Sequence, residues 1–490
     1  MGDSFMWLGA VLLLTVILCA PGRSKPGLQR LGRDPGLFGL KIWFARIDFL
    51  RNGQKMIEDS YSKSRDTNYV VQTLLGDQVI LGPRFLPELR MLPESSLNAT
   101  AALVESVLGS YSGVDILLNG HLSSDICRGP LTKNMPAILP QMIDELDLVK
   151  SDLLGKKGVE SPSVAYDLIY SLISRISSRA FVGAPLCYDK GWIEAVNAFP
   201  MDVEKVKFAL MIFPDFMRPW IVSLLPQKHR LVRNHRYVRN LLFPASKLAK
   251  TEEESTVLNL LLQSSKDTDP ETLTSRMILL TAAAFHNSSM ATVQVLFNLC
   301  AMPDYLPALR LEAQAALEDG GGVWNMESLK NLQKLDSFFK ESQRVNASTF
   351  LGFDRKVMST IKLSDGTVID AGETIAMPSG AMSQDHSYYT DPSKFDGYRF
   401  CHVTPELQGQ SPDLEKEYTG IEPGNLSWGH GRFSCPGRWY ASTVMKLLLA
   451  TLILEYDFKF PDGQSTRPAN YVMDVHVLPD MKQQVLFKKR

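Results

Sequence analysis

The chain has 490 residues, of which 45% are hydrophobic, and this is enough apolar material for a large buried core. Acidic and basic residues almost cancel to a formal net charge of -1, so a nucleic acid partner, which needs a basic surplus, is not expected. The six cysteines are scattered without disulfide-like spacing, which is typical of a chain that folds in a reducing compartment.

The N-terminal segment carries one apolar run at residues 5–20. About 16 residues of helix span roughly 24 Å, slightly less than the ~30 Å hydrocarbon core of a bilayer. Positive charges follow this run and do not precede it, which favours an uncleaved membrane anchor at residues 1–22 over a cleaved signal peptide. Residues 23–35 are rich in proline and glycine and are expected to form a hinge. Residues 36–490 are then expected to form one folded domain.

The first elements of that domain are a hairpin and a series of helices. Short apolar runs at residues 69–71 and 79–81 flank Gly76-Asp77, and this pattern predicts a β-hairpin. Helical spacing of apolar residues dominates the sequence that follows, including residues 121–133, which contain Arg128.

A long central helix is predicted to begin at Asp269-Pro270. Aspartate suits the N-cap and proline the first helical position. No glycine or proline then interrupts the sequence until Pro303. A helix of about 33 residues would span roughly 50 Å. Apolar residues surround its middle, so we expect it to be buried.

Polar residues interrupt the apolar middle of this helix: His286, Asn287, Ser288 and Ser289. Buried polar groups need partners, and in the middle of a helix they often mark a functional site. The structural alternative is that the serines bond back to carbonyls of the preceding turn while His286 is satisfied in the core. The residues alone leave both interpretations open.

Two further elements are predicted before the C-terminal part. Residues 326–345 have a helical pattern that places Glu341 and Arg344 on one face. Such a pair carries no functional signal by itself, because an exposed ion pair stabilises a protein very little. Within residues 356–376, the turn signal Asp365-Gly366 predicts a second hairpin.

The most informative motif is the sequence WGHGRFSCPGR at residues 428–438. Pro436 suits the first position of a helix, and helical spacing continues behind it. Cys435 is therefore expected at a helix N-terminus, where the dipole and free amides favour a thiolate. Gly429 and Gly431 allow tight backbone turns in front of the sulfur.

One thiolate held in this way suits a single iron ion, because zinc and iron–sulfur sites need several ligands and no second cysteine lies nearby. Gly437 leaves room where a flat cofactor would press on the helix, and Arg432 is a natural partner for an anionic group of that cofactor. The alternative is an inert cysteine at a buried helix start.

The motif resembles the haem-binding loop of cytochrome P-450 enzymes, aromatic-G-x-G-x-x-x-C-x-G. Trp428 takes the aromatic position, and Phe433 stands where many relatives have histidine. The resemblance implies a mainly α fold with small β-sheets and a long central helix over haem b. It implies Cys435 as the axial ligand of the haem iron and a propionate contact from Arg128, although the usual W-x-x-x-R pattern is absent.

The resemblance also gives the polar island a role. The family has A/G-G-x-D/E-T/S in its central helix, where the acid and the hydroxyl handle protons for oxygen activation. Aligned in this way, Asn287 takes the place of the acid and Ser288 that of the hydroxyl. An amide does not ferry protons as a carboxylate does, so His286 or ordered water is expected to carry part of the relay. A similar A-x-H-x-T/S-S pattern occurs in fungal members of secondary metabolism.

Two other sets of residues gain roles from the resemblance. The family joins an E-x-x-R helix to a later arginine in a buried network that holds the cysteine loop, and Glu341, Arg344 and Arg399 match these positions. The resemblance also implies a substrate pocket, with candidate contacts at Ala283, Asn346, Ser348 and Phe350.

The implied activity is that of a haem-thiolate monooxygenase acting on a hydrophobic terpenoid or meroterpenoid intermediate. No nucleotide-binding glycine-rich loop is visible, so electrons from NADPH are expected through a membrane-bound NADPH-cytochrome P-450 reductase. Arg432, Arg438 and Lys446 are candidate contacts for it. The anchor implies a single-pass protein of the endoplasmic reticulum with a cytosolic catalytic domain.

Two other functions stay open on the sequence. A haem-thiolate isomerase or dehydratase needs no oxygen activation, and Asn287 in the place of the acid motivates it. A non-catalytic haem-binding or sensor protein is the third reading, against which the anchor, the hinge and the hydroxyl of Ser288 argue.

Overall fold

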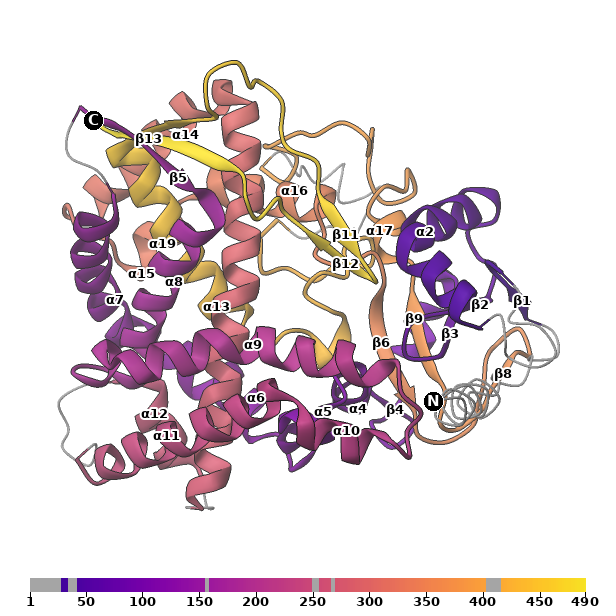
Figure 1. Ribbon diagram of the computed structural model, residues 1–490. Helices are drawn as coiled ribbons and strands as arrows, with labels where there is room; N and C mark the ends of the chain where they lie inside the picture. Colours follow the sequence, from indigo (N-terminus) through magenta and orange to yellow (C-terminus); the bar gives the residue numbers. More distant parts are fainter. Residues whose placement is uncertain (1–27, 34–41, 155–157, 249–254, 266–268, 402–415) are drawn as a thin grey trace, which may run out of the picture.

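The computed structural model describes residues 28–33, 42–154, 158–248, 255–265, 269–401 and 416–490 (Figure 1). The predicted anchor at residues 1–22 lies outside the described residues. Part of the predicted hinge is described, and there β1 (Gln29–Arg30) pairs in parallel with β2. Among the described residues, no helix combines the length and the apolar character needed to cross a bilayer.

The fold is mainly α-helical with small sheets, as predicted. The long helices are α2 (Ile42–Lys63), α7 (Thr132–Leu153), α8 (Ala165–Val182), α9 (Lys190–Met211), α11 (Pro226–Leu248), α13 (Pro270–Ala301), α14 (Leu306–Asp319), α16 (Gln333–Val345) and α19 (Arg438–Glu455). The short ones include α4 (Ala99–Ser106), α6 (Leu122–Ile126), α10 (Arg218–Leu224), α12 (Val257–Ser264), α15 (Met326–Lys330) and α17 (Ser379–Met382).

The central helix α13 is confirmed. It has 32 residues, and the side chain of Asp269 caps it by accepting a hydrogen bond of 2.9 Å from the amide of Thr272. It runs through the middle of the helical part and packs against α8, α9 and α19 (Figure 1). Apolar side chains of these helices and of α7 form the largest core.

The main sheet has six strands in the order β1-β2-β3-β9-β6-β4. Its first predicted hairpin is confirmed, since β2 (Tyr69–Gln72) and β3 (Asp77–Ile80) pair antiparallel. Gly76 takes a φ of 142° at their turn, which a side chain would hinder. The sheet lies on the opposite side of the molecule from α7 and α19 (Figure 1).

The second predicted hairpin is present but each arm is divided. Its inner parts, β7 (Ile361–Lys362) and β8 (Val368–Ile369), pair around Gly366. Its outer parts, β6 (Gly352–Val357) and β9 (Thr374–Met377), join the main sheet, which β4 (Leu97–Asn98) completes. The remaining sheets contain β10 (Tyr456–Lys459), β13 (Gln484–Lys489) and β5 (Glu160–Val164), and the hairpin of β11 (Tyr471–Met473) with β12 (His476–Leu478).

The helix predicted at residues 326–345 is in fact two helices, α15 and α16, separated at residues 331–332. The reason lies in another helix. The carboxylate of Glu312 on α14 accepts hydrogen bonds from the amides of Lys334 and Leu335, at 2.6 and 3.0 Å. This external cap starts a new helix, and it leaves no trace in the local sequence pattern.

Candidate haem-thiolate site

The cysteine loop turns sharply in front of its sulfur. Gly429 and Gly431 have φ angles of 72° and 68°, the left-handed conformation that glycine adopts most easily. A Cβ added to Gly429 would also lie 3.2 Å from the carbonyl oxygen of Phe433. The loop closes through a 2.7 Å hydrogen bond from the amide of Cys435 to the carbonyl of Trp428. Both glycines therefore serve the tight turns expected of them.

The helix behind the cysteine begins at Arg438, so the predicted start at Pro436 is wrong by two residues. Pro436 and Gly437 form a turn that precedes it. The expected amides are nevertheless present, because the N–H groups of Gly437 and Arg438 bond to the sulfur and lower the pKa of Cys435. Burial has the larger, opposite effect, and the pKa of the unligated thiol is raised.

Arg128 holds the loop from one side. It lies in the π-turn at Cys127–Leu131, and its guanidinium donates hydrogen bonds of 2.6 and 3.3 Å to the carbonyls of Arg432 and Ser434. The positive charge of Arg128 also lowers the pKa of Cys435. Arg128, one of the predicted cofactor contacts, thus lies at the cysteine loop although the W-x-x-x-R pattern is absent from the sequence.

Other side chains fix the loop from behind. Arg438 donates hydrogen bonds to the carbonyls of Cys435 and Thr419, at 2.9 and 3.0 Å. The indole N–H of Trp428 donates to the carbonyl of Tyr418 at 2.7 Å. Arg438 therefore serves the loop itself, whereas the side chain of Arg432 is exposed.

Lys446 does not match its predicted role at a docking surface. Its ammonium group pairs with the carboxylate of Asp336 at 2.9 Å, and both side chains are largely buried. The pair ties α19 to α16 in the interior of the fold.

Sequence reasoning missed Arg355. This residue of β6 is 5% exposed, and its guanidinium lies 5.1 Å from the ring centroid of Phe433 and 3.4 Å from the carbonyl oxygen of His430. Burial lowers the pKa of Arg355 to about 10, which shows that the cation is poorly solvated. A lone arginine in a strand pattern carries no local signal, so only the tertiary fold reveals its position at the loop.

The three residues predicted to form a charge network lie together. Arg344 donates to both carboxylate oxygens of Glu341, at 2.7 and 2.8 Å, and Arg399 donates to one of them at 3.1 Å. The remaining donors bind backbone, since Arg344 reaches the carbonyl of Ser383 and Arg399 that of Lys394. Glu341 and Arg344 are fully buried, so their attraction is not weakened by solvent.

One face of α13 remains accessible although the rest of its middle is buried. Leu279 and His286 are half-accessible, and the other accessible and half-accessible positions follow a helical stripe: Leu280, Ala283, Ala284, Asn287 and Ala291. Because i, i+3, i+4 and i+7 lie on one side of a helix, the side chains of this stripe share one face of α13. Ala283 and Asn287 are the most accessible, whereas Ser288 is buried and its carbonyl accepts from the hydroxyl of Thr292.

His286 points to another neighbour. Its Nδ1 lies 2.8 Å from the hydroxyl oxygen of Tyr166 on α8, and their rings meet edge to face. Burial lowers the pKa of His286, and the nearby His476 lowers it further, so the imidazole is neutral near pH 7. Ser289 bonds back to the carbonyl of Phe285, which is the structural role left open for the serines.

The predicted pocket residues of the segment after α16 behave differently from one another. Ser348 is exposed, and its carbonyl accepts from the amide of Val477. Asn346 is buried and its amide oxygen accepts a 3.0 Å hydrogen bond from Asn470, while Phe350 packs against Phe49. Both buried side chains thus have protein partners, and their contact with a substrate stays a prediction.

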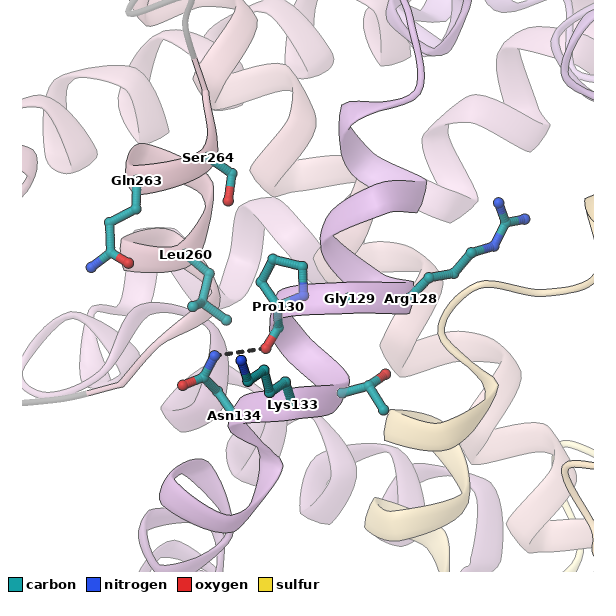
Figure 2. A pocket seen from close by; sticks show the side chains of 9 residues that line it. Arg128, Gly129, Pro130, Lys133, Asn134, Leu260, Gln263 and Ser264 are labelled. Atoms are coloured by element: carbon teal, nitrogen blue, oxygen red, sulfur yellow. Dashed lines mark hydrogen bonds between the residues drawn. The ribbon is translucent and has the colours of Figure 1, made fainter.

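A pocket of about 620 Å³ lies between α12 and the start of α7, close to the loop (Figure 2). Its lining contains Pro130, Lys133, Leu260 and Gln263 and no cysteine, histidine or carboxylate. Figure 2 shows the guanidinium of Arg128 pointing out of this pocket, toward the C-terminal loop. The pocket therefore lacks the groups of the predicted chemistry.

The sequence profile of the family described as cytochrome P450 matches residues 133–487, well over half of the chain. The chain belongs to the cytochrome P450 family. Fungal relatives extend the match. Ent-kaurene oxidase P450-4 of Gibberella fujikuroi is 31% identical, covering 91% of this chain and 90% of the relative. Cytochrome P450 monooxygenase AN1598 of Emericella nidulans is 29% identical over 91% and 85%, and paxP of Penicillium paxilli 29% over 99% and 96%.

This cytochrome P450 is accordingly a haem monooxygenase, an oxidoreductase that incorporates oxygen from O2. The side chains around Cys435 fit a haem. Among the described residues no three histidine, cysteine or acidic side chains gather around a metal site, and Cys435 is free of any disulfide. A Cβ added to Gly437 would meet nothing within 4 Å, so the approach to the sulfur is open. The buried cation of Arg355 suits an anionic group such as a haem propionate.

Proposed function

We propose that the chain oxidises a hydrophobic, polycyclic terpenoid-type intermediate of fungal secondary metabolism, with O2 and electrons from NADPH. The observation that carries this proposal is the accessible stripe on α13, whose members are apolar apart from Asn287. An apolar wall with few polar groups suits a hydrocarbon skeleton. Relatives named ent-kaurene oxidase support a substrate of this class.

Haem b would be held by Cys435 as axial ligand, with Trp428 and Gly437 bordering it and Arg128, Arg355 and Arg432 available to its propionates. Bound haem supplies the oxidising chemistry, which a thiolate ligand favours. The chain supplies the rest. Glu341, Arg344 and Arg399 hold the backbone of residues 383–396, which precede the loop, by charge-assisted hydrogen bonds.

Proton handling would involve the polar island of α13. The side chain of Asn287 is exposed on the accessible stripe of α13, so its amide can donate to and accept from a group bound there. His286, neutral and in contact with the hydroxyl of Tyr166, can pass a proton along that hydrogen bond. Ser288 follows Asn287 in the chain and is buried, so its hydroxyl would be less accessible to such a group.

Electrons would come from NADPH-cytochrome P-450 reductase. We further propose single-pass attachment to the endoplasmic reticulum through residues 1–22, with the catalytic domain in the cytosol. An exposed apolar patch on and before α10 supports membrane contact, since Trp220 and Leu224 are 78% and 76% exposed and Phe216 is 61% exposed.

The deciding experiment incubates the holoenzyme with reductase, NADPH, isotopically labelled O2 and a panel of terpenoid skeletons. We expect product that carries the isotope and forms only with NADPH. Product formed without NADPH would overturn the proposal and favour the second candidate, a haem-thiolate isomerase or dehydratase. That candidate is motivated by Asn287, because no carboxylate occupies its position on the accessible face.

A further inference from the structure

Buried and half-buried ionisable side chains from three elements interact electrostatically with one another. They are Glu204 and Lys207 on α9, His286 on α13, and Asp474 and His476 on the β11–β12 hairpin, and we call them the interior polar cluster. Lys207 and Glu204 form an ion pair of 2.7 Å, in which the lysine side chain is only 4% exposed.

The members of the cluster are electrostatically coupled across the three elements. The charges of Lys207 and Glu204 act on both Asp474 and His476, and His476 in turn acts on His286. Such coupling requires proximity, because charge interactions fade with distance and with access to solvent. The cluster is therefore one electrostatic unit and not a series of separate surface groups.

Asp474 is the member of the cluster whose burial is not compensated by hydrogen bonds to both carboxylate oxygens. It is 8% exposed, and among the described residues its Oδ1 has no hydrogen-bond partner. It also takes a φ of 55° at the hairpin turn, a conformation uncommon outside glycine. A buried acceptor without a donor destabilises a protein, so a ligand that brings a donor to this oxygen would remove that cost.

The cluster lies beside the proposed reaction space. His286 immediately precedes Asn287, whose side chain is on the accessible stripe of α13. The hairpin that carries Asp474 is bonded to the segment of Ser348, through the 2.8 Å hydrogen bond from Val477. A ligand that covers the stripe could thus extend toward the hairpin.

The charges of the cluster decide what such a ligand presents. A carboxylate would meet the carboxylates of Glu204 and Asp474, and a cation would meet Lys207. A neutral hydroxyl avoids both repulsions, donates to Asp474 and accepts from an imidazole N–H. Burial keeps both histidines neutral and therefore able to donate and accept.

We propose that the interior polar cluster binds a hydroxyl group already present on the substrate, away from the carbon that is oxidised, with Asp474 as the acceptor. This inference rests on the proposed function and narrows it to an oxygenated polycyclic substrate. The enzyme that supplies the substrate must then be one that introduces a hydroxyl, by hydroxylation or by a cyclisation that ends in capture of water.

The test measures equilibrium binding to the holoenzyme by calorimetry. The probes share one skeleton, namely dehydroabietane, its alcohol dehydroabietinol and its acid dehydroabietic acid, after binding of the hydrocarbon has been established. We expect the alcohol to bind at least about tenfold more tightly than the hydrocarbon or the acid, because a site built for a hydroxyl discriminates strongly against its absence.

Variants separate recognition from folding. Asp474→Gly tolerates the positive φ and removes the acceptor, so the preference for the alcohol should fall to within about twofold, while Asp474→Asn keeps an acceptor and should retain most of it. Lys459→Met removes the lysine of an exposed ion pair and should change nothing. The reduced carbon-monoxide difference spectrum checks that each variant keeps its haem.

The two hypotheses fail in different ways. Equal binding of hydrocarbon and alcohol by an enzyme that oxidises them with NADPH would overturn the hydroxyl site and leave the proposed function standing. A preference for the alcohol that survives in Asp474→Gly would equally overturn the role of Asp474. Tight, Asp474-dependent binding of the alcohol without any NADPH-dependent product would instead retain the site and reject the monooxygenase reaction on such substrates.

Discussion

Both carboxylate oxygens of Glu341 are bound by the guanidinium of Arg344, at 2.7 and 2.8 Å, at a place from which solvent is excluded. The same carboxylate accepts the amide of Asp396 at 2.9 Å. Through Arg399 it is connected to backbone carbonyls of the segment that precedes the cysteine loop. A single carboxylate thus joins α16 to that segment.

Replacing Glu341 by glutamine should destabilise the protein strongly, because two arginines then lose their anionic partner inside the fold. Breaking a buried ion pair from one side typically costs about 3–5 kcal/mol. Urea unfolding and the haem content after purification measure the effect. Asp462→Asn, which removes a 91% exposed member of the Lys459 ion pair, should cost less than about 1 kcal/mol. Equal losses for the two variants would contradict the structural role of Glu341.

Cys435→Ser should abolish the red-shifted band of the reduced carbon-monoxide complex, since a thiolate-ligated haem gives this band and a hydroxyl ligand does not. Cys127→Ser is the matched control. Cys127 is a buried neighbour whose pKa is raised to about 12 by burial and by the charge of Cys435. The Cys127→Ser variant should keep the band. If it loses the band while Cys435→Ser keeps it, Cys435 is not the ligand.

Asn287→Ala should impair turnover more than Ser288→Ala. The Asn287 side chain is exposed on the accessible stripe of α13, whereas Ser288 is 4% exposed. Loss of a hydrogen bond worth about 1.4 kcal/mol corresponds to roughly tenfold in rate. The measurement is the ratio of product formed to NADPH consumed. A larger effect at Ser288 would contradict this order and support the role that the resemblance gives to its hydroxyl.

Acid should destabilise the protein through its buried histidines. The folded-state pKa of His286 is lowered from 6.5, mainly by burial. The stability that its neutral imidazole contributes is therefore fully present above pH 6.5 and is lost as the pH falls through the lowered pKa. His286→Gln keeps a partner for Tyr166 but does not titrate, so its urea midpoint should fall less between pH 7 and pH 5. An unchanged slope would show that His286 is solvated in the folded state.

The sequence predicted those elements whose signals are local. Asp269-Pro270 starts α13 and Gly76-Asp77 turns the first hairpin, because caps and turns depend on a few adjacent residues. The start of α19 was misplaced because Pro436 satisfies the rule for a first helical residue, although the loop needs a further turn before Arg438. Residues 326–345 were misread because the cap of α16 comes from Glu312.

The site was predictable where a motif fixes the chemistry. Cys435 and its glycines stand out in the sequence, and the E-x-x-R pattern indicated Glu341. The placement of Arg355 and the loss of Asn346 to an interior hydrogen bond were not predictable, since both depend on which distant segments meet. The accessible face of α13 likewise required the fold, because apolar residues surround the middle of the helix and the sequence marks no face as accessible.

The accessible stripe of α13 is built largely from alanine, at positions 283, 284 and 291. The exposed Ala283 marks a point where a larger residue would meet a bound substrate, whereas Ala284 and Ala291 pack against the main core. The shape of ring system that this chain admits is consequently open to gradual change, one side chain at a time. Related enzymes could diverge in substrate along this helix while their chemical machinery stays the same.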